Sequence, residues 1–88
     1  MARKQIKEVV DAANRIRPVL FGRPPEIQGA ILAELLSCWL AGHITDTPEY
    51  TQALRDELLI EHIEAVRKLI SVNEKAILAA VRKRGRMQ

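Results

Sequence analysis

Aromatic residues and cysteine are both scarce in this 88-residue sequence. Phe21, Trp39 and Tyr50 are the three aromatic residues, and Cys38 is the single cysteine. A lone cysteine excludes an internal disulfide and gives no evidence for an oxidising compartment. With so few aromatics, the core must consist of Leu, Ile, Val and Ala, a composition that suits helices packed on helices better than a sheet.

Long apolar runs are absent as well. No stretch reaches the roughly 20 apolar residues that a membrane span requires. The first residues, Met1-Ala2-Arg3-Lys4-Gln5, lack the apolar core of a signal peptide. We therefore expect a soluble, cytoplasmic protein that makes no use of a membrane.

Acidic side chains are scarce at the two ends of the sequence. The net charge is +3, yet residues 1–23 carry six basic and two acidic side chains, and residues 82–88 carry four basic and none acidic. Residues 24–81 carry four basic and nine acidic side chains. The basic ends could therefore meet an anionic partner, or the acidic middle, including that of a second copy.

Apolar residues recur at helical spacing throughout the chain, and prolines and glycines divide it into four segments. We expect helices over residues 2–16, 25–41 and 48–70, and a short fourth helix that begins at a Ser71-x-x-Glu74 capping box and stops at Gly85. Pro18 should end or kink the first helix. Gly42 should cap the second, and Thr47 should be the N-cap of the third.

The predicted fold is thus all-α, a compact bundle of four helices with the last one short. Residues 1–84 would form a single helical domain, and residues 85–88 a basic C-terminal tail. The second helix is apolar around well over half its circumference, so it should lie at the centre.

Signatures of catalysis, metal binding and nucleotide binding are weak or absent. Cys38, His43 and His62 do not converge at a spacing that holds zinc tetrahedrally. Ser37 and Ser71 lack the strand–turn–helix of a nucleophile elbow, and the glycines form no phosphate loop. We expect Cys38 to be buried and unreactive within its apolar helix. The sequence therefore predicts a protein that is not an enzyme and uses no cofactor or metal.

His62 stands near the centre of the apolar arc of the third helix, between Leu58, Leu59, Val66 and Leu69. A polar ring at such a position needs a hydrogen-bond partner. His62 is either a core histidine whose ring is hydrogen-bonded, or a residue that lines a pocket or a two-fold interface. A small-ligand pocket near Trp39 and His62 is a weaker option on the same observation.

Leu36, Trp39, Leu40 and Ile60 are the predicted contact surface. Leu36 and Leu40 widen the apolar arc of the second helix beyond what one neighbour covers, and Ile60 lies on the polar side of the third. A contiguous apolar patch would indicate an interface. The main hypothesis is therefore a non-enzymatic protein–protein interaction module, most simply a homodimer through the apolar faces of the second and third helices, or else a binder of another protein.

The alternative hypothesis is an accessory nucleic-acid-binding protein that uses its basic ends. Arg82, Lys83, Arg84 and Arg86 are the predicted phosphate contacts, joined by the basic residues near the N-terminus. Against it, the third helix is acidic on its outer side, and the second has almost no charge with which to contact bases. The two hypotheses differ in how binding responds to salt.

Overall fold

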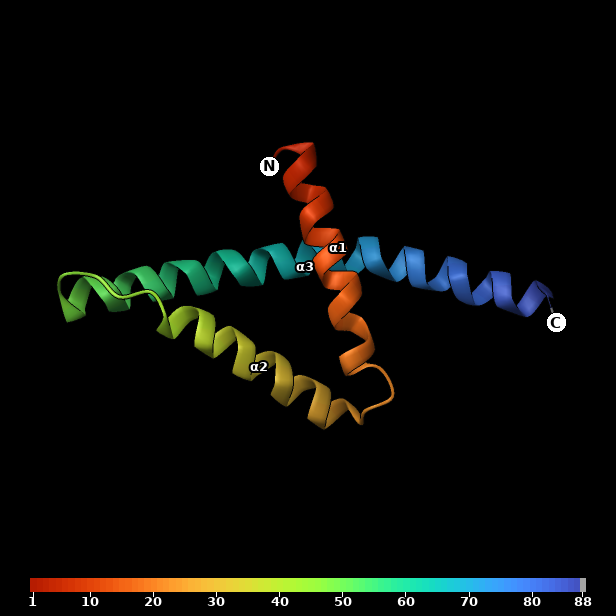
Figure 1. Cartoon of the computed structure of the whole chain (residues 1–88), viewed down its shortest axis with the longest axis horizontal. Helices are drawn as coiled ribbons and strands as arrows, with labels where there is room; N and C mark the ends of the chain where they lie inside the picture. Colours follow the sequence, from red (N-terminus) through yellow and green to blue (C-terminus); the bar gives the residue numbers. More distant parts are fainter. Residues whose placement is uncertain (88) are drawn as a thin grey trace. The chain divides into compact units, whose positions relative to one another are not determined.

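Three helices make up the computed structural model, which describes residues 1–87 and the side chains of residues 1–85. They are α1 (Arg3–Leu20), α2 (Pro25–Ala41) and α3 (Pro48–Met87), and the described residues contain no strand (Figure 1). The prediction of an all-α protein is confirmed. The prediction of a compact bundle of four helices is wrong, because residues expected to form a third and a fourth helix form one.

α1 continues two residues beyond Pro18, which was expected to end or kink it. Pro18 has no N–H to donate to the carbonyl four residues earlier, and α1 continues for only two residues beyond it. The helix closes when the Phe21 amide donates to the Arg17 carbonyl at 3.0 Å. The following Gly22 has a φ of +86°, a left-handed conformation that glycine adopts without a Cβ clash.

The turn from α1 to α2 is held by the side chains of Gln28 and Arg23. The Gln28 side-chain amide donates to the Leu20 carbonyl at 3.0 Å and to the Arg23 carbonyl at 2.9 Å. Arg23 also donates from Nε to the Val19 carbonyl at 2.6 Å. The bonds to Val19 and Leu20 satisfy carbonyls that the end of α1 leaves without an intrahelical partner, and the bond to Arg23 holds the turn itself.

α2 begins at Pro25 and ends at Ala41, as the sequence predicts, but its end is capped differently. Among the described residues only Gly22 has a positive φ, so Gly42 does not form the expected left-handed cap. The Arg55 guanidinium donates instead to the carbonyls of Leu40 at 2.9 Å, Ala41 at 2.8 Å and His43 at 3.2 Å. A cation suits this position, because a helix C-terminus carries partial negative charge.

The start of α3 is fixed by threonines. The Thr47 hydroxyl accepts from the Tyr50 amide at 3.1 Å, which confirms the predicted N-cap. Thr51 is the one buried residue of the described part of the chain, and its hydroxyl accepts from the Thr45 amide at 2.9 Å. The Thr45 and Thr51 hydroxyls lie 2.7 Å apart. These bonds tie the loop before α3 to its first turn.

α3 is a single helix of 40 residues, and the break predicted at Ser71 does not occur. Ser71 does not cap a new helix, since its hydroxyl donates back to the Lys68 carbonyl at 3.3 Å within the same helix. No proline or glycine stands between Pro48 and Gly85, and strong helix formers follow Asn73. Gly85 was expected to stop the helix, but it lies inside α3, which continues to Met87.

The chain divides into two units, Met1–Trp39 and the residues from Leu40 onward. No apolar side chain of the described residues is buried, so neither unit has the core that a compact bundle requires. The single domain expected over residues 1–84 stays a prediction. Within residues 1–87, no helix combines the length and the apolarity that a membrane crossing needs.

The two candidate caps of α3 give a first prediction. Thr47→Ala should lower the free energy of unfolding by about 1 kcal/mol, because the Tyr50 amide loses its partner. Ser71→Ala should change it by less than about 0.5 kcal/mol, because Ser71 lies within the helix. Urea unfolding followed by circular dichroism measures both. A larger loss from Ser71→Ala would show that the helix does start anew at that residue.

The Arg55 cap gives a second prediction. Arg55→Ala should destabilise the chain by about 1–3 kcal/mol, since three carbonyls at the end of α2 lose a charged donor. Arg55→Lys should restore only part of this, because an ammonium cannot span the carbonyls as a planar guanidinium does. Hydrogen exchange should rise mainly in residues 40–51. Unchanged exchange there in Arg55→Ala would contradict the assigned role.

Candidate interaction surface

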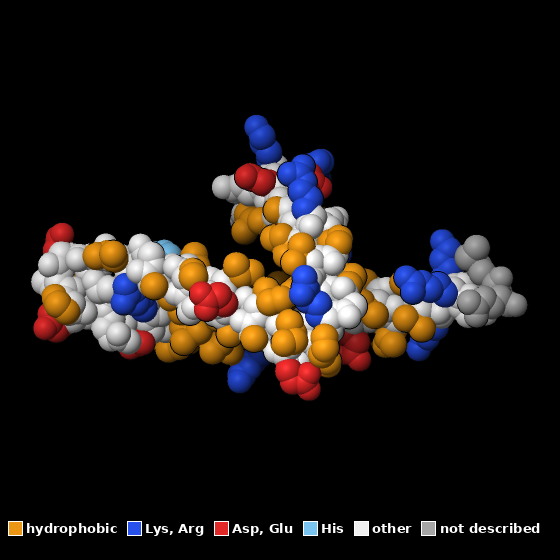
Figure 2. Space-filling model, turned by 60° about the horizontal axis from the view of Figure 1, so that its bottom comes forward, with side chains coloured by type: hydrophobic (Ala, Val, Ile, Leu, Met, Phe, Trp, Pro, Cys, Tyr) orange, Lys and Arg blue, Asp and Glu red, His pale blue; other side chains and the backbone are white. Residues whose placement is uncertain are grey.

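Apolar side chains are exposed along all three helices (Figure 2). In α1 the predicted apolar stripe is exposed at Ile6, Val9, Val10 and Ile16. In α2 and α3 the exposed apolar side chains include Ile27, Leu32, Leu35, Ile63, Val66, Leu69, Ile70 and Ile77. Isolated exposed apolar residues are common, but a continuous set on one helix side marks a surface that binds something.

The predicted contact residues are divided between the two units. Leu36 and Trp39 lie in the first unit and Leu40 and Ile60 in the second. Leu36 and Leu40 are half-buried, whereas Trp39 is 44% and Ile60 is 59% exposed. Their role in an interface stays a prediction, and the exposure of Trp39 and Ile60 leaves both accessible to a partner.

His62 and Cys38 are both exposed, contrary to the burial expected for them. The Cys38 thiol lies 3.6 Å from Glu34 Oε1, a residue one helical turn earlier. His62 is not among the residues that line the hollow described below. Among the described residues no three His, Cys, Asp or Glu side chains are grouped so as to hold a metal ion.

The continuity of α3 reveals a heptad pattern that the sequence analysis missed. Residues that are apolar at every position except Asn73 recur at alternating intervals of three and four across Ser71, where a helix break was expected. In heptad notation the a positions are Ile63, Ile70 and Ile77, and the d positions are Leu59, Val66, Asn73 and Ala80. Positions a and d form the contact line of helix pairs. We call this set the α3 stripe: Leu59, Ile63, Val66, Ile70, Asn73, Ile77 and Ala80.

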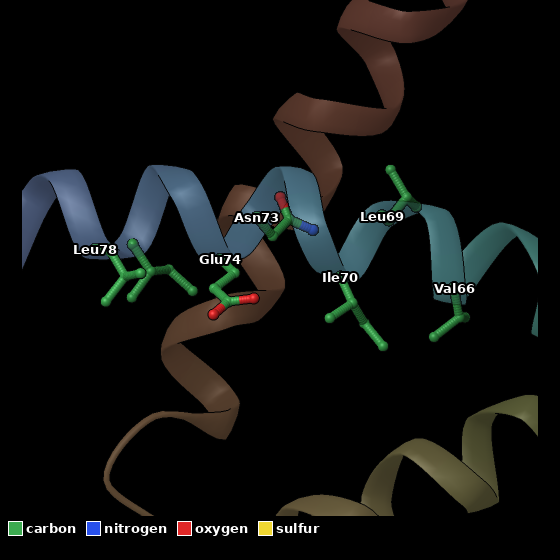
Figure 3. A pocket seen from close by; sticks show the side chains of 7 residues that line it. Val66, Leu69, Ile70, Asn73, Glu74 and Leu78 are labelled. Carbon is green, nitrogen blue, oxygen red and sulfur yellow. The ribbon is translucent and has the colours of Figure 1, made fainter.

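An open hollow of about 550 Å³ lies along the second half of the α3 stripe. Val66 and Ile70 extend to the same side of the helix beside it (Figure 3). Its polar contributors are Asn73 and Glu74, and the rest of its lining is apolar: Val66, Leu69, Ile70, Ile77 and Leu78. A surface of this shape and chemistry accommodates an apolar helix side better than a polar small molecule.

The two halves of α3 carry opposite charge. Residues 48–64 contain five acidic side chains and one basic side chain, Arg55, which caps α2. Residues 65–87 contain seven basic side chains and one acidic side chain, Glu74. The helix therefore changes sign along its length while its apolar stripe continues across the change.

The predicted phosphate contacts lie in the last turns of α3. Arg82, Lys83 and Arg84 are exposed, and as consecutive residues they point to different sides of the helix. The side chain of Arg86 lies outside the described residues. Near the other end, the charges of α1 are mixed, with Lys7 and Asp11 paired at 2.7 Å.

Arg55 is a second feature that the sequence analysis missed, because its role as the cap of α2 was not predicted. A signal was present, because Arg55 interrupts the apolar arc formed by Leu54, Leu58 and Leu59. A lone arginine on an apolar helix side must find acceptors nearby. Which carbonyls it finds depends on how the loop after α2 folds back, and spacing along α3 does not encode that.

No family model matches the chain, and neither the curated proteins nor the solved structures contain one with significant similarity to it. The shared feature of the described residues is a set of exposed apolar side chains flanked by charge.

Proposed function

We propose that this chain is a non-enzymatic helical interaction module that associates with a second copy of itself through its apolar helix faces. The observation that carries the proposal is that no apolar side chain of the described residues is buried. Burial of apolar surface contributes roughly 25 cal/mol per Å² and is the main favourable term in folding. A partner would supply the burial that the single chain lacks.

Helix energetics support association. Helical stability in proteins comes mostly from packing an amphipathic side, and less from intrinsic helix propensity. α1 and α2 have 18 and 17 residues, and each exposes apolar side chains. In small proteins oligomerisation commonly provides the missing core. Two-fold dimers are the commonest outcome, which favours a homodimer over a larger assembly.

A second candidate function, binding of nucleic acid, draws support from one feature of α3. Lys68, Lys75 and Arg82 are seven residues apart, so they share one side of the helix and form a short basic strip. The same side carries Glu57, Glu61 and Glu64 one to three turns earlier, which would repel a phosphate backbone. Self-association is therefore the better supported function.

Light scattering over a concentration series, at low and high salt and with a reductant that prevents Cys38 disulfides, tests the proposal. The monomer mass is 9.9 kDa, and we expect twice that mass at micromolar concentration and at both salt concentrations. Apolar contacts are insensitive to salt screening, whereas phosphate binding weakens steeply with salt. A monomer at every concentration would exclude self-association.

Trp39 offers a second readout of the same equilibrium. Its side chain is 44% exposed in the single chain, so an interface that includes α2 should move its emission to shorter wavelength as concentration rises. Leu36→Asp should abolish this shift, while Glu26→Gln, on the first turn of the same helix, should not. An emission maximum that is independent of concentration in a proven dimer would place the interface away from Trp39.

A further inference from the structure

We infer that the α3 stripe is the contact line of the dimer, and that the α3 helices of the two copies run antiparallel across it. This inference rests on the proposed self-association and names the surface and the orientation. The α3 stripe covers three heptads, the span over which a heptad pattern begins to indicate a helix pair. Its members from Ile63 onward are exposed, so the surface is free to receive a second helix.

The stripe suits a helix better than any other occupant. Isoleucine at the a positions Ile63, Ile70 and Ile77 supplies the branched side chains that pack into the holes of a facing helix. The hollow beside Ile70 is open and mainly apolar, as expected where such a side chain inserts. A second α3 presents the same pattern and therefore fits it along the whole length.

The charges of α3 determine the orientation. Residues 48–64 are predominantly acidic and residues 65–87 predominantly basic. A parallel pair would place acidic beside acidic and basic beside basic, which is repulsive. An antiparallel pair places each acidic half beside the basic half of the other copy. It also sets the two helix dipoles in opposite directions.

The charged residues that flank the stripe agree with this orientation. Arg67 and Glu74 are both e positions, one heptad apart, and adjoin the contact line. In antiparallel pairs, e positions face e positions of the partner helix. A two-fold axis near Ile70 would therefore place Arg67 of each copy beside Glu74 of the other. In a parallel pair, e positions face g positions of the partner helix. Arg67 would then lie beside the partner's His62, and Glu74 beside the partner's Leu69, so neither would lie beside an opposite charge.

A pair of substitutions tests the contact line in the full-length protein. Ile70 and Val72 are both β-branched and similarly exposed, at 58% and 62%, but only Ile70 belongs to the stripe. Ile70→Asp should raise the dimer dissociation constant by about a hundredfold or more, because a carboxylate would be buried between the helices. Val72→Asp should leave it within about threefold. Because the single chain buries neither residue, both variants should retain their helix content, which circular dichroism verifies.

Distances between spin labels on the two copies test the orientation, in a Cys38→Ser background. With the axis near Ile70, labels at Ser71→Cys should lie within about 25 Å of each other, given an interhelical separation of about 8–10 Å. Labels at Glu57→Cys should be roughly 40 Å apart, because about 27 residues of helix separate them along the axis. Two short distances would show a parallel pair and overturn the orientation.

The remaining outcomes separate this inference from the proposed function. A dimer that Ile70→Asp leaves intact, or one in which both label pairs are far apart, would place the contact elsewhere and overturn the inference while self-association stands. A monomer in light scattering would overturn both. Loss of the dimer in Ile70→Asp but not in Val72→Asp, with one short and one long distance, is the result we expect.

Discussion

Apolar surface that the single chain leaves in water is the constraint on which the rest of this structure depends. Three helices each carry an apolar side, and none of the described apolar residues is buried. Such a chain gains its secondary structure from local hydrogen bonds and strong helix formers, but local terms alone leave helices marginal. Any account of its function must therefore explain what covers these sides, and a second copy with the same surface is the simplest cover.

Hydrogen bonds from polar side chains stabilise the turns between the helices. Gln28 donates to one carbonyl at the end of α1 and to one in the turn that follows. Arg55 donates to two carbonyls at the end of α2 and to one in the loop after it. The Thr45–Thr51 pair holds the loop before α3. Each satisfies backbone groups that a helix end or turn would otherwise leave without partners. The turns are thus specified by hydrogen bonds, while the apolar sides remain available for recognition.

Much of the local structure could be predicted from residue types. The starts of α2 and α3 follow from Pro25 and from Thr47-Pro48, because proline and a threonine cap favour a helix N-terminus through local geometry alone. The predicted break at Ser71 failed because the same Ser-x-x-Glu motif can lie within a helix, where the serine hydroxyl bonds backward. Splitting α3 there also hid the heptad pattern that crosses it.

By itself the sequence determined that the chain is helical, where α2 and α3 begin, and that apolar and charged residues occupy separate sides. These properties depend on side-chain type and spacing within a few turns. Only the tertiary structure decided that α3 is one helix of 40 residues, that Arg55 caps α2, and that His62 and Cys38 are exposed. Burial and capping depend on which segments meet across a turn, and spacing along the chain does not specify that.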